Sequence, residues 1–98
     1  MNIVAVTACS TGIAQTYIAA DVLKYCARVR GHKIKVETQG ALGINNPITS
    51  TDLGKADLVI ITNDVPIDNI CRFDGVTTIS VAIDDIIRDP QKVIDSLS

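Results

Sequence analysis

Cys9 stands between an apolar stretch and an alanine-rich one, in the segment VAVTACSTGIAQTYIAA that runs from Val4 to Ala20. The residues before the thiol, Asn2 to Thr7, are rich in β-branched types and predict a strand, and a helical pattern begins at about Gly12. We therefore expect the sulfur in a turn from a strand into a helix. Backbone N–H groups at the start of a helix have no partner within the helix, and they bind anions. A thiolate or a phosphoryl group would be stabilised there.

The residues after Cys9 are suited to holding such an anion. Gly12 allows the backbone to approach closely, and the neighbouring hydroxyl groups are donors. The same field is expected to lower the pKa of the Cys9 thiol, which a sulfur that accepts a phosphoryl group requires. The predicted phosphate-binding loop comprises Ser10, Thr11, Gly12, Ile13, Ala14, Gln15 and Thr16. The alternative interpretation, a small apolar residue packed at a turn, stays open from these residues alone.

Cysteine-based phosphatases also place a thiol in such a loop, with the spacing Cys-x5-Arg-Ser/Thr, where the arginine grips the phosphate. In this chain the matching positions are Cys9, Gln15 and Thr16. Because glutamine carries no charge to offset a transferring phosphoryl group, the loop lacks the residue that drives hydrolysis. A loop that holds a phosphocysteine without hydrolysing it is suited to passing the group on. A low-molecular-weight cysteine phosphatase or arsenate reductase, and a non-catalytic regulatory module of the same fold, are the alternative hypotheses.

The rest of the chain alternates strand patterns with helical ones. Further strands are predicted at Lys33–Thr38, Asp57–Thr62 and Val76–Ser80, and the segment QGALGINNPITSTD between the first two of these reads as a long loop. Helical patterns occur at about Gly12–Arg30, near Leu53 and Lys55 with Ser50 or Thr51 as the cap, at Val65–Ile70 as a brief helix or turn, and at Asp84–Leu97, where Pro90 can split the helix. Right-handed crossovers then predict an α/β fold with a four-stranded parallel sheet and helices on both faces. We expect a Rossmann-like three-layer sandwich with the strands in the order 2-1-3-4.

Composition argues against several classes of function. Nine basic and eleven acidic residues give a net charge of -2 without a run of like charge, so nucleic acid is not an expected partner. Unbroken apolar stretches such as Leu58 to Ile61 are far shorter than the roughly 20 residues that a membrane span needs, and we expect a cytoplasmic chain without direct membrane insertion. Three cysteines without a CxxC pair predict neither a disulfide framework nor a metal site. No cofactor is expected.

Four segments, VTACSTGIAQTYIAADVL, IKVETQG, ADLVIITND and IDNICRF, closely resemble the fructose-type enzyme IIB component of the bacterial phosphoenolpyruvate-dependent sugar phosphotransferase system (PTS). The similarity spans essentially the whole chain, so residues 1–98 are expected to form a single fructose-like IIB domain. The resemblance implies a protein phosphohistidine–sugar phosphotransferase. Cys9 would accept a phosphoryl group from a phosphohistidine of enzyme IIA and transfer it to a fructose-like sugar bound by the membrane enzyme IIC. It also implies peripheral association with the inner membrane through enzyme IIC.

The chain departs from the family pattern at two positions of the loop. The family usually has Cys-Pro-Thr-Gly-Ile-Ala-His-Thr, whereas this chain has Ser10 and Gln15. Ser10 regains an N–H and a hydroxyl, which favours anion binding. Gln15 replaces a titratable side chain with a neutral one, so any proton or charge that the histidine supplies is absent.

Gln39 and Arg72 are possible accessory residues. Gln39 follows the second predicted strand and is expected beside the Cys9 loop, where it would contact the phosphoryl group, shape the partner surface or simply end the strand. Arg72 would serve a docking surface or cover a core Phe73. The remaining candidates are read as structural: Asp64 as a cap or loop tie, Cys26 and Cys71 as packing residues, and His32 as a residue past the end of a helix.

Overall fold

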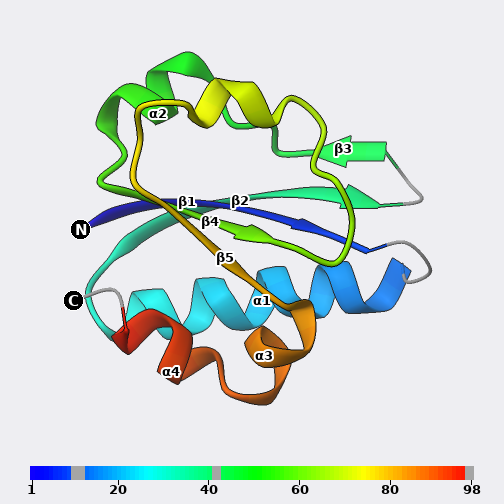
Figure 1. Ribbon diagram of the computed structural model, residues 1–98. Helices are drawn as coiled ribbons and strands as arrows, with labels where there is room; N and C mark the ends of the chain where they lie inside the picture. The colour runs from blue at the N-terminus through cyan, green and yellow to red at the C-terminus, as the bar shows by residue number, and fades with distance from the viewer. Residues whose placement is uncertain (10–12, 41–42, 97–98) are drawn as a thin grey trace.

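Helices cover both faces of a central β-sheet in the computed structural model, which describes residues 1–9, 13–40 and 43–96 (Figure 1). The strands are β1 (Asn2–Ala8), β2 (Lys33–Gly40), β3 (Gly43–Asn45), β4 (Leu58–Thr62) and β5 (Thr78–Val81). The helices are α1 (Ile13–Val29), α2 (Ser50–Lys55), α3 (Ile83–Arg88) and α4 (Pro90–Asp95), with a short 3-10 helix, η1 (Ile70–Phe73). The α/β class and the three layers that the sequence predicts are confirmed.

The sheet is mixed rather than wholly parallel. Within the described residues it has five strands in the order β3-β2-β1-β4-β5, and β3 pairs with β2 in the antiparallel direction. The four parallel strands keep the predicted relative order, but the prediction of a four-stranded parallel sheet is wrong. The fifth strand lies in the segment predicted as a loop. Gly43, with φ +92°, begins β3 and pairs with Gly40 of β2, and Asn46, with φ 52°, follows the last residue of β3.

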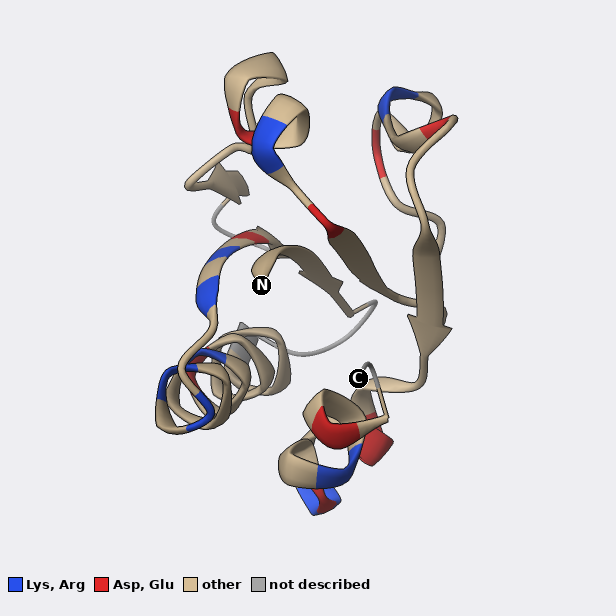
Figure 2. Ribbon diagram, turned by 90° about the vertical axis from the view of Figure 1, so that its left-hand side faces the viewer, with Lys and Arg blue, Asp and Glu red and all other residues tan. Residues whose placement is uncertain are grey.

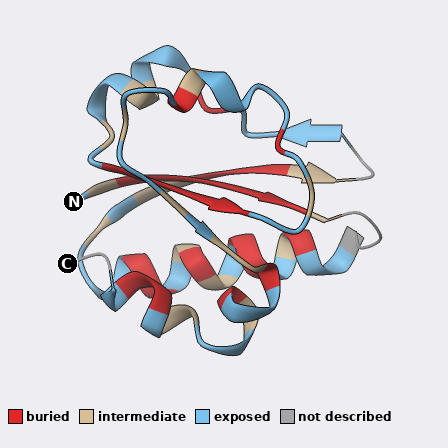
Figure 3. Ribbon diagram, in the orientation of Figure 1, coloured by how far each residue is buried: buried red, intermediate tan, exposed pale blue. Residues whose placement is uncertain are grey.

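The two central strands, β1 and β4, are buried along most of their length, as Figure 3 shows. Their sequences, NIVAVTA and LVIIT, are almost continuously apolar, because helices cover them on both sides. One core lies between the sheet and helices α1, α3 and α4, and includes Leu23, Ile60 and Ile86. The other lies under α2 and η1, and includes Val6, Ile61 and Phe73.

Residue contacts refine several of the predicted element boundaries. The closing helix is split at Pro90, as predicted, and Pro90 begins α4. The carboxylate of Asp64 accepts a hydrogen bond from the N–H of Ile83 (2.8 Å), so its predicted role as a loop tie is confirmed. In the segment 65–70, predicted as a brief helix or turn, residues 68 and 69 form a turn, and η1 begins at Ile70. The backbone of Asp68 bonds to the side chain of Gln39 instead of to a helical neighbour.

A capping box begins α2, and its cap is Thr49 rather than the predicted Ser50 or Thr51. The Thr49 hydroxyl accepts from the N–H of Asp52 (3.1 Å), and the Asp52 carboxylate accepts from the N–H of Thr49 (2.9 Å). Of the three hydroxyl residues only Thr49 has an acidic residue three positions later, which is the signature of this motif. The Asp52 carboxylate also pairs with Lys35 of β2 (2.6 Å), so the box fastens α2 to the sheet.

The Asp52 contacts predict a pH-dependent contribution to stability. The hydrogen bond from Lys35 and those from Thr49 lower the pKa of Asp52 from 3.8 to about 2. A carboxylate with a depressed pKa stabilises the fold fully above the ordinary value and loses that contribution as the pH falls through the folded value. Urea unfolding of wild type and Asp52→Asn is therefore expected to show a stability difference at about pH 6 that shrinks as the pH falls below 3.8. A difference that stays constant over this range would contradict the assignment.

Candidate functional site

Cys9 lies directly after β1, at the carboxyl end of a central strand of the sheet, and α1 begins four positions later. Its side chain is partly buried and packs against the core under α1. The Cys9 Sγ donates to the side-chain oxygen of Gln15 (3.4 Å), which lies in the first turn of the helix. Cys9 thus lies between the end of a strand and the start of a helix, as predicted. Its sulfur contacts Gln15, one of the two positions at which this chain departs from the family pattern.

The predicted phosphate-binding loop is only partly within the described residues. Ser10, Thr11 and Gly12 lie outside them. Ile13, Ala14, Gln15 and Thr16 form the first turn of α1, where Ala14 and Gln15 are exposed and Thr16 is buried. The described part therefore supplies the helix start beside the thiol.

Two buried threonine hydroxyls that the sequence did not single out hold the chain on either side of this loop. The Thr7 hydroxyl donates to the backbone carbonyl of Thr16 (3.1 Å) and so joins β1 to α1. The Thr62 hydroxyl accepts from the N–H of Ala8 (3.0 Å) and donates to the carbonyl of Ala8 (3.3 Å). In the sequence, these two residues could have been found as threonines at or next to the end of an otherwise apolar strand.

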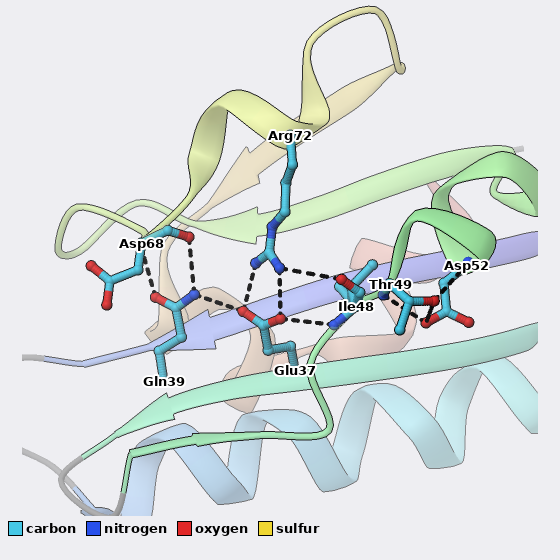
Figure 4. Close-up of polar contacts among 7 residues, drawn as sticks. All are labelled: Glu37, Gln39, Ile48, Thr49, Asp52, Asp68 and Arg72. Atoms are coloured by element: carbon cyan, nitrogen blue, oxygen red, sulfur yellow. Dashed lines mark hydrogen bonds and ion pairs between the residues drawn. The ribbon is translucent and has the colours of Figure 1, made fainter.

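Glu37 is a carboxylate with no exposed surface, and it lies in β2 on the face covered by α2 and η1 (Figure 4). Arg72 of η1 binds both of its oxygens, at 2.8 and 2.6 Å. The N–H of Ile48 donates to the same carboxylate (2.8 Å), as does the amide of Gln39 (2.7 Å). Desolvation raises the pKa of Glu37, but these hydrogen bonds and the charge of Arg72 outweigh it and lower the pKa below the ordinary 4.5. Glu37 is therefore ionised at neutral pH.

Gln39 and Arg72, the predicted accessory residues, both contact Glu37. Besides its bond to that carboxylate, the Gln39 amide donates to the carbonyl of Asp68 (3.2 Å) and accepts from the N–H of Asp68 (2.9 Å). The Arg72 guanidinium lies 4.7 Å from the ring centre of the buried Phe73, so it covers that residue as expected, but it is bound to Glu37 rather than solvated. These contacts fasten the segment after β4 to the end of β2, and a direct role of either side chain on a phosphoryl group stays a prediction.

A hollow of about 190 Å³ opens at the carboxyl ends of β1 and β2. Its walls include Ala8, Gln39, Ile44, Pro66 and Asp68, so it lies next to the strand end that carries Cys9. The segment that Gln39 fastens forms one wall, and β3 forms another. The network around Glu37 therefore shapes the surface beside the thiol.

The other two cysteines and the histidine differ in their burial. Cys26 is buried on α1 in the core, which confirms its packing role. Cys71 is exposed in η1, so the expectation of a packing role for it is wrong. His32 follows the end of α1, and its backbone N–H donates to the carbonyl of Ala27 (2.9 Å). Among the described residues, no three or more His, Cys, Asp or Glu side chains are grouped so as to hold a metal ion. No described helix combines the length and apolarity required to cross a membrane.

Charged residues of both signs lie on the helices and loops around the sheet (Figure 2). The C-terminal helices carry both, including the exposed ion pair of Arg88 with Asp85. Nine basic and eleven acidic residues leave the chain with a small net charge of -2.

Comparison with known proteins assigns the chain to a family. The family model described as the lactose/cellobiose-specific IIB subunit of the PTS matches residues 4–96. The fructose-like EIIB component 2 of the PTS of Escherichia coli K12 is 41% identical over 98% of this chain and 91% of its own length. A solved domain of the fructose-specific IIABC component of Borrelia burgdorferi has a TM-score of 0.90 at 40% identity, covering 96% of this chain and 89% of that one. The chain therefore belongs to the PTS IIB family.

Within that family the relatives define the fructose type. The fructose-specific EIIB'BC component of Rhodobacter capsulatus is 40% identical over 98% of this chain, which corresponds to 16% of that longer protein. The resemblance to a fructose-type IIB domain, and with it a phosphotransferase role in PTS sugar transport, is confirmed.

The Glu37–Arg72 pair predicts a large cost for removing one partner. Arg72→Met leaves a buried carboxylate without its counter-ion and is expected to lower the free energy of unfolding by about 3–5 kcal/mol. Replacing both residues, as Glu37→Leu with Arg72→Met, is expected to cost much less, because no charge stays buried. Urea unfolding at neutral pH measures both.

The exposed pair of Arg88 with Asp85 provides the matched control. Arg88→Met also removes an arginine from an ion pair, but its change is expected to stay below about 1 kcal/mol, because solvent screens that pair. Equal effects of Arg72→Met and Arg88→Met would contradict the role given to burial.

Proposed function

We propose that this IIB domain is a phosphocysteine carrier. Cys9 accepts a phosphoryl group from a phosphohistidine of enzyme IIA and transfers it to a fructose-like sugar bound by the membrane enzyme IIC. The observation that carries the proposal is the position of Cys9, directly after a central strand at its carboxyl end and four positions before a helix start. In open α/β sheets, ligands bind at this edge. Family membership supplies the phosphotransferase role.

The first transfer is a displacement at phosphorus. The Cys9 thiolate attacks the phosphorus atom, an S–P bond forms, the P–N bond of the phosphohistidine breaks, and the imidazole of the donor leaves. In the second transfer a sugar hydroxyl attacks the same phosphorus, the S–P bond breaks, and the thiolate is regenerated while the hydroxyl proton passes to a base or to solvent. Helix N–H groups and the hydroxyls of Ser10 and Thr11 would stabilise the negative charge in both steps.

Gln15 favours transfer over hydrolysis in this proposal. Its amide contacts the sulfur, and by its spacing from Cys9 it occupies the position of the arginine in the Cys-x5-Arg pattern. A neutral amide orients the thiol through a hydrogen bond but does not neutralise the charge that develops on a phosphoryl group attacked by water. The phosphocysteine would then persist until the sugar arrives.

The partners follow from the same proposal. Enzyme IIA is the donor, and enzyme IIC presents the acceptor. The name of the Rhodobacter capsulatus relative joins B and C designations in one protein, and a relative from Escherichia coli K12 is named a fructose-like PTS system EIIBC component. We infer that residues 1–98 act as one IIB domain on the cytoplasmic side of the inner membrane, in contact with enzyme IIC. Gln39 and Arg72 would shape the surface that these partners meet.

Incubation with enzyme IIA that carries radiolabelled phosphohistidine tests the carrier role. The label is expected on Cys9, in an acid-resistant form that prior alkylation of the thiol prevents. Cys9→Ser is expected to abolish labelling, while Cys71→Ser, which removes the exposed cysteine of η1, is expected to keep it. Label on His32, the single histidine of the chain, or no label at all would contradict the proposal.

Two further measurements separate the proposal from its alternatives. Turnover of p-nitrophenyl phosphate that depends on Cys9 would favour a phosphatase. Failure to restore sugar uptake in a strain that lacks the cognate IIB, together with normal folding, would favour a regulatory module.

A further inference from the structure

The last residues of β1 reach beyond their ladder with β4. The parallel pairing of these strands ends at Val6 with Ile61, although β1 continues to Ala8. On its other side Ala8 still pairs with Gln39 of β2. The N–H and carbonyl groups of Ala8 need partners on the β4 side, because buried backbone groups that lack a hydrogen bond are costly.

The hydroxyl of Thr62 takes the place of that missing ladder. It accepts from the N–H of Ala8 at 3.0 Å and donates to the carbonyl of Ala8 at 3.3 Å. The carbonyl belongs to the peptide group that joins Ala8 to Cys9, so the second bond fixes the orientation of that peptide. One side chain therefore holds the chain on the residue before the thiol.

Burial makes these two bonds directional and strong. Thr62 is 1% exposed and Ala8 is 2% exposed. Water does not reach the pair to replace a lost partner, and a hydroxyl buried without hydrogen bonds would be unfavourable. Valine has almost the same shape and would extend the apolar run LVII of β4, so the burial of this position does not by itself call for a hydroxyl.

We propose that Thr62 is a positioning residue for the transfer at Cys9. Its hydroxyl orients the Ala8–Cys9 peptide and thereby directs the sulfur toward the helix start. The Thr7 hydroxyl, bonded to the carbonyl of Thr16 at 3.1 Å, holds the far side of the same turn. This inference rests on the proposed carrier function, and it concerns a residue of a different strand that reaches the site only through the backbone of Ala8.

Three variants separate the hydroxyl from the shape of the side chain. Thr62→Val removes only the hydroxyl, Thr62→Ser keeps it without the methyl group, and Thr77→Val repeats the first change at an exposed threonine. Phosphoryl transfer from phosphorylated enzyme IIA is expected to fall by about tenfold or more in kcat/KM for Thr62→Val, since small displacements of a reacting atom slow transfer strongly. Thr62→Ser and Thr77→Val are expected to stay within about twofold of wild type.

The reactivity of the thiol gives a readout that needs no partner protein. Trypsin cuts after Lys24, Arg28 and Arg72, among other sites, so that Cys9, Cys26 and Cys71 fall on separate peptides. Mass spectrometry then follows the alkylation of each cysteine by iodoacetamide as a function of pH. In Thr62→Val the pH profile of Cys9 is expected to shift, while Cys71 keeps its wild-type profile.

The outcomes divide clearly. Wild-type transfer and a wild-type Cys9 profile in Thr62→Val would overturn the inference, even if that variant were less stable, because Thr62 would then serve stability alone. Equal losses in Thr62→Val and Thr62→Ser would also overturn it, since the methyl group rather than the hydroxyl would matter. Absence of transfer in wild type would contradict the carrier function, whereas the alkylation profiles would still test the positioning by Thr62.

Hydrogen exchange covers the case in which Thr62→Val does not fold. In the wild-type protein the amide of Ala8 is expected to exchange slowly, like those of the central strands, because Thr62 accepts its hydrogen. An Ala8 amide that exchanges at the rate of an exposed loop would overturn the inference without any variant.

Discussion

The buried ion pair of Glu37 with Arg72 is the interaction on which the layer of α2 and η1, over one face of the sheet, depends. Glu37 has no contact with solvent, so its charge requires the guanidinium and the two N–H donors that surround it. These partners come from three separate segments, and each must be in place for the carboxylate to be satisfied. The pair therefore makes the positions of η1, the Ile48 turn and the end of β2 mutually dependent.

That dependence reaches the thiol through Gln39. The Gln39 amide bonds to Glu37 and to both backbone groups of Asp68, and the segment that it holds forms a wall of the hollow beside Cys9. On the other side of the strand end, Thr62 holds the residue before the thiol. The residue before Cys9 is thus tied by a side chain from β4, and the wall beside it by one from β2, which suits the proposed carrier role, because transfer requires a well-positioned reacting atom.

Much of this arrangement was predictable from the sequence. The strand, the thiol and the helix start at Cys9 follow from residues within one short segment, and the alternation of apolar strands with helices predicts the α/β class. The loop tie of Asp64 and the break at Pro90 were predictable for the same reason, since caps and prolines act on their immediate neighbours. Strand β3 was missed because its three residues lie among turn formers and are held by pairing with β2.

The sequence by itself determined the fold class, the family resemblance and the place of Cys9, because hydrophobic periodicity and turn chemistry act over a few residues. Only the tertiary structure decided the partners of Glu37 and of Ala8. Arg72 is 35 residues from Glu37, and Thr62 is 54 residues from Ala8. In the sequence, Glu37 looks like an ordinary surface residue of a strand and Thr62 like an ordinary residue at the end of one. Burial then removes water as a partner and leaves each group only the contact that the fold provides.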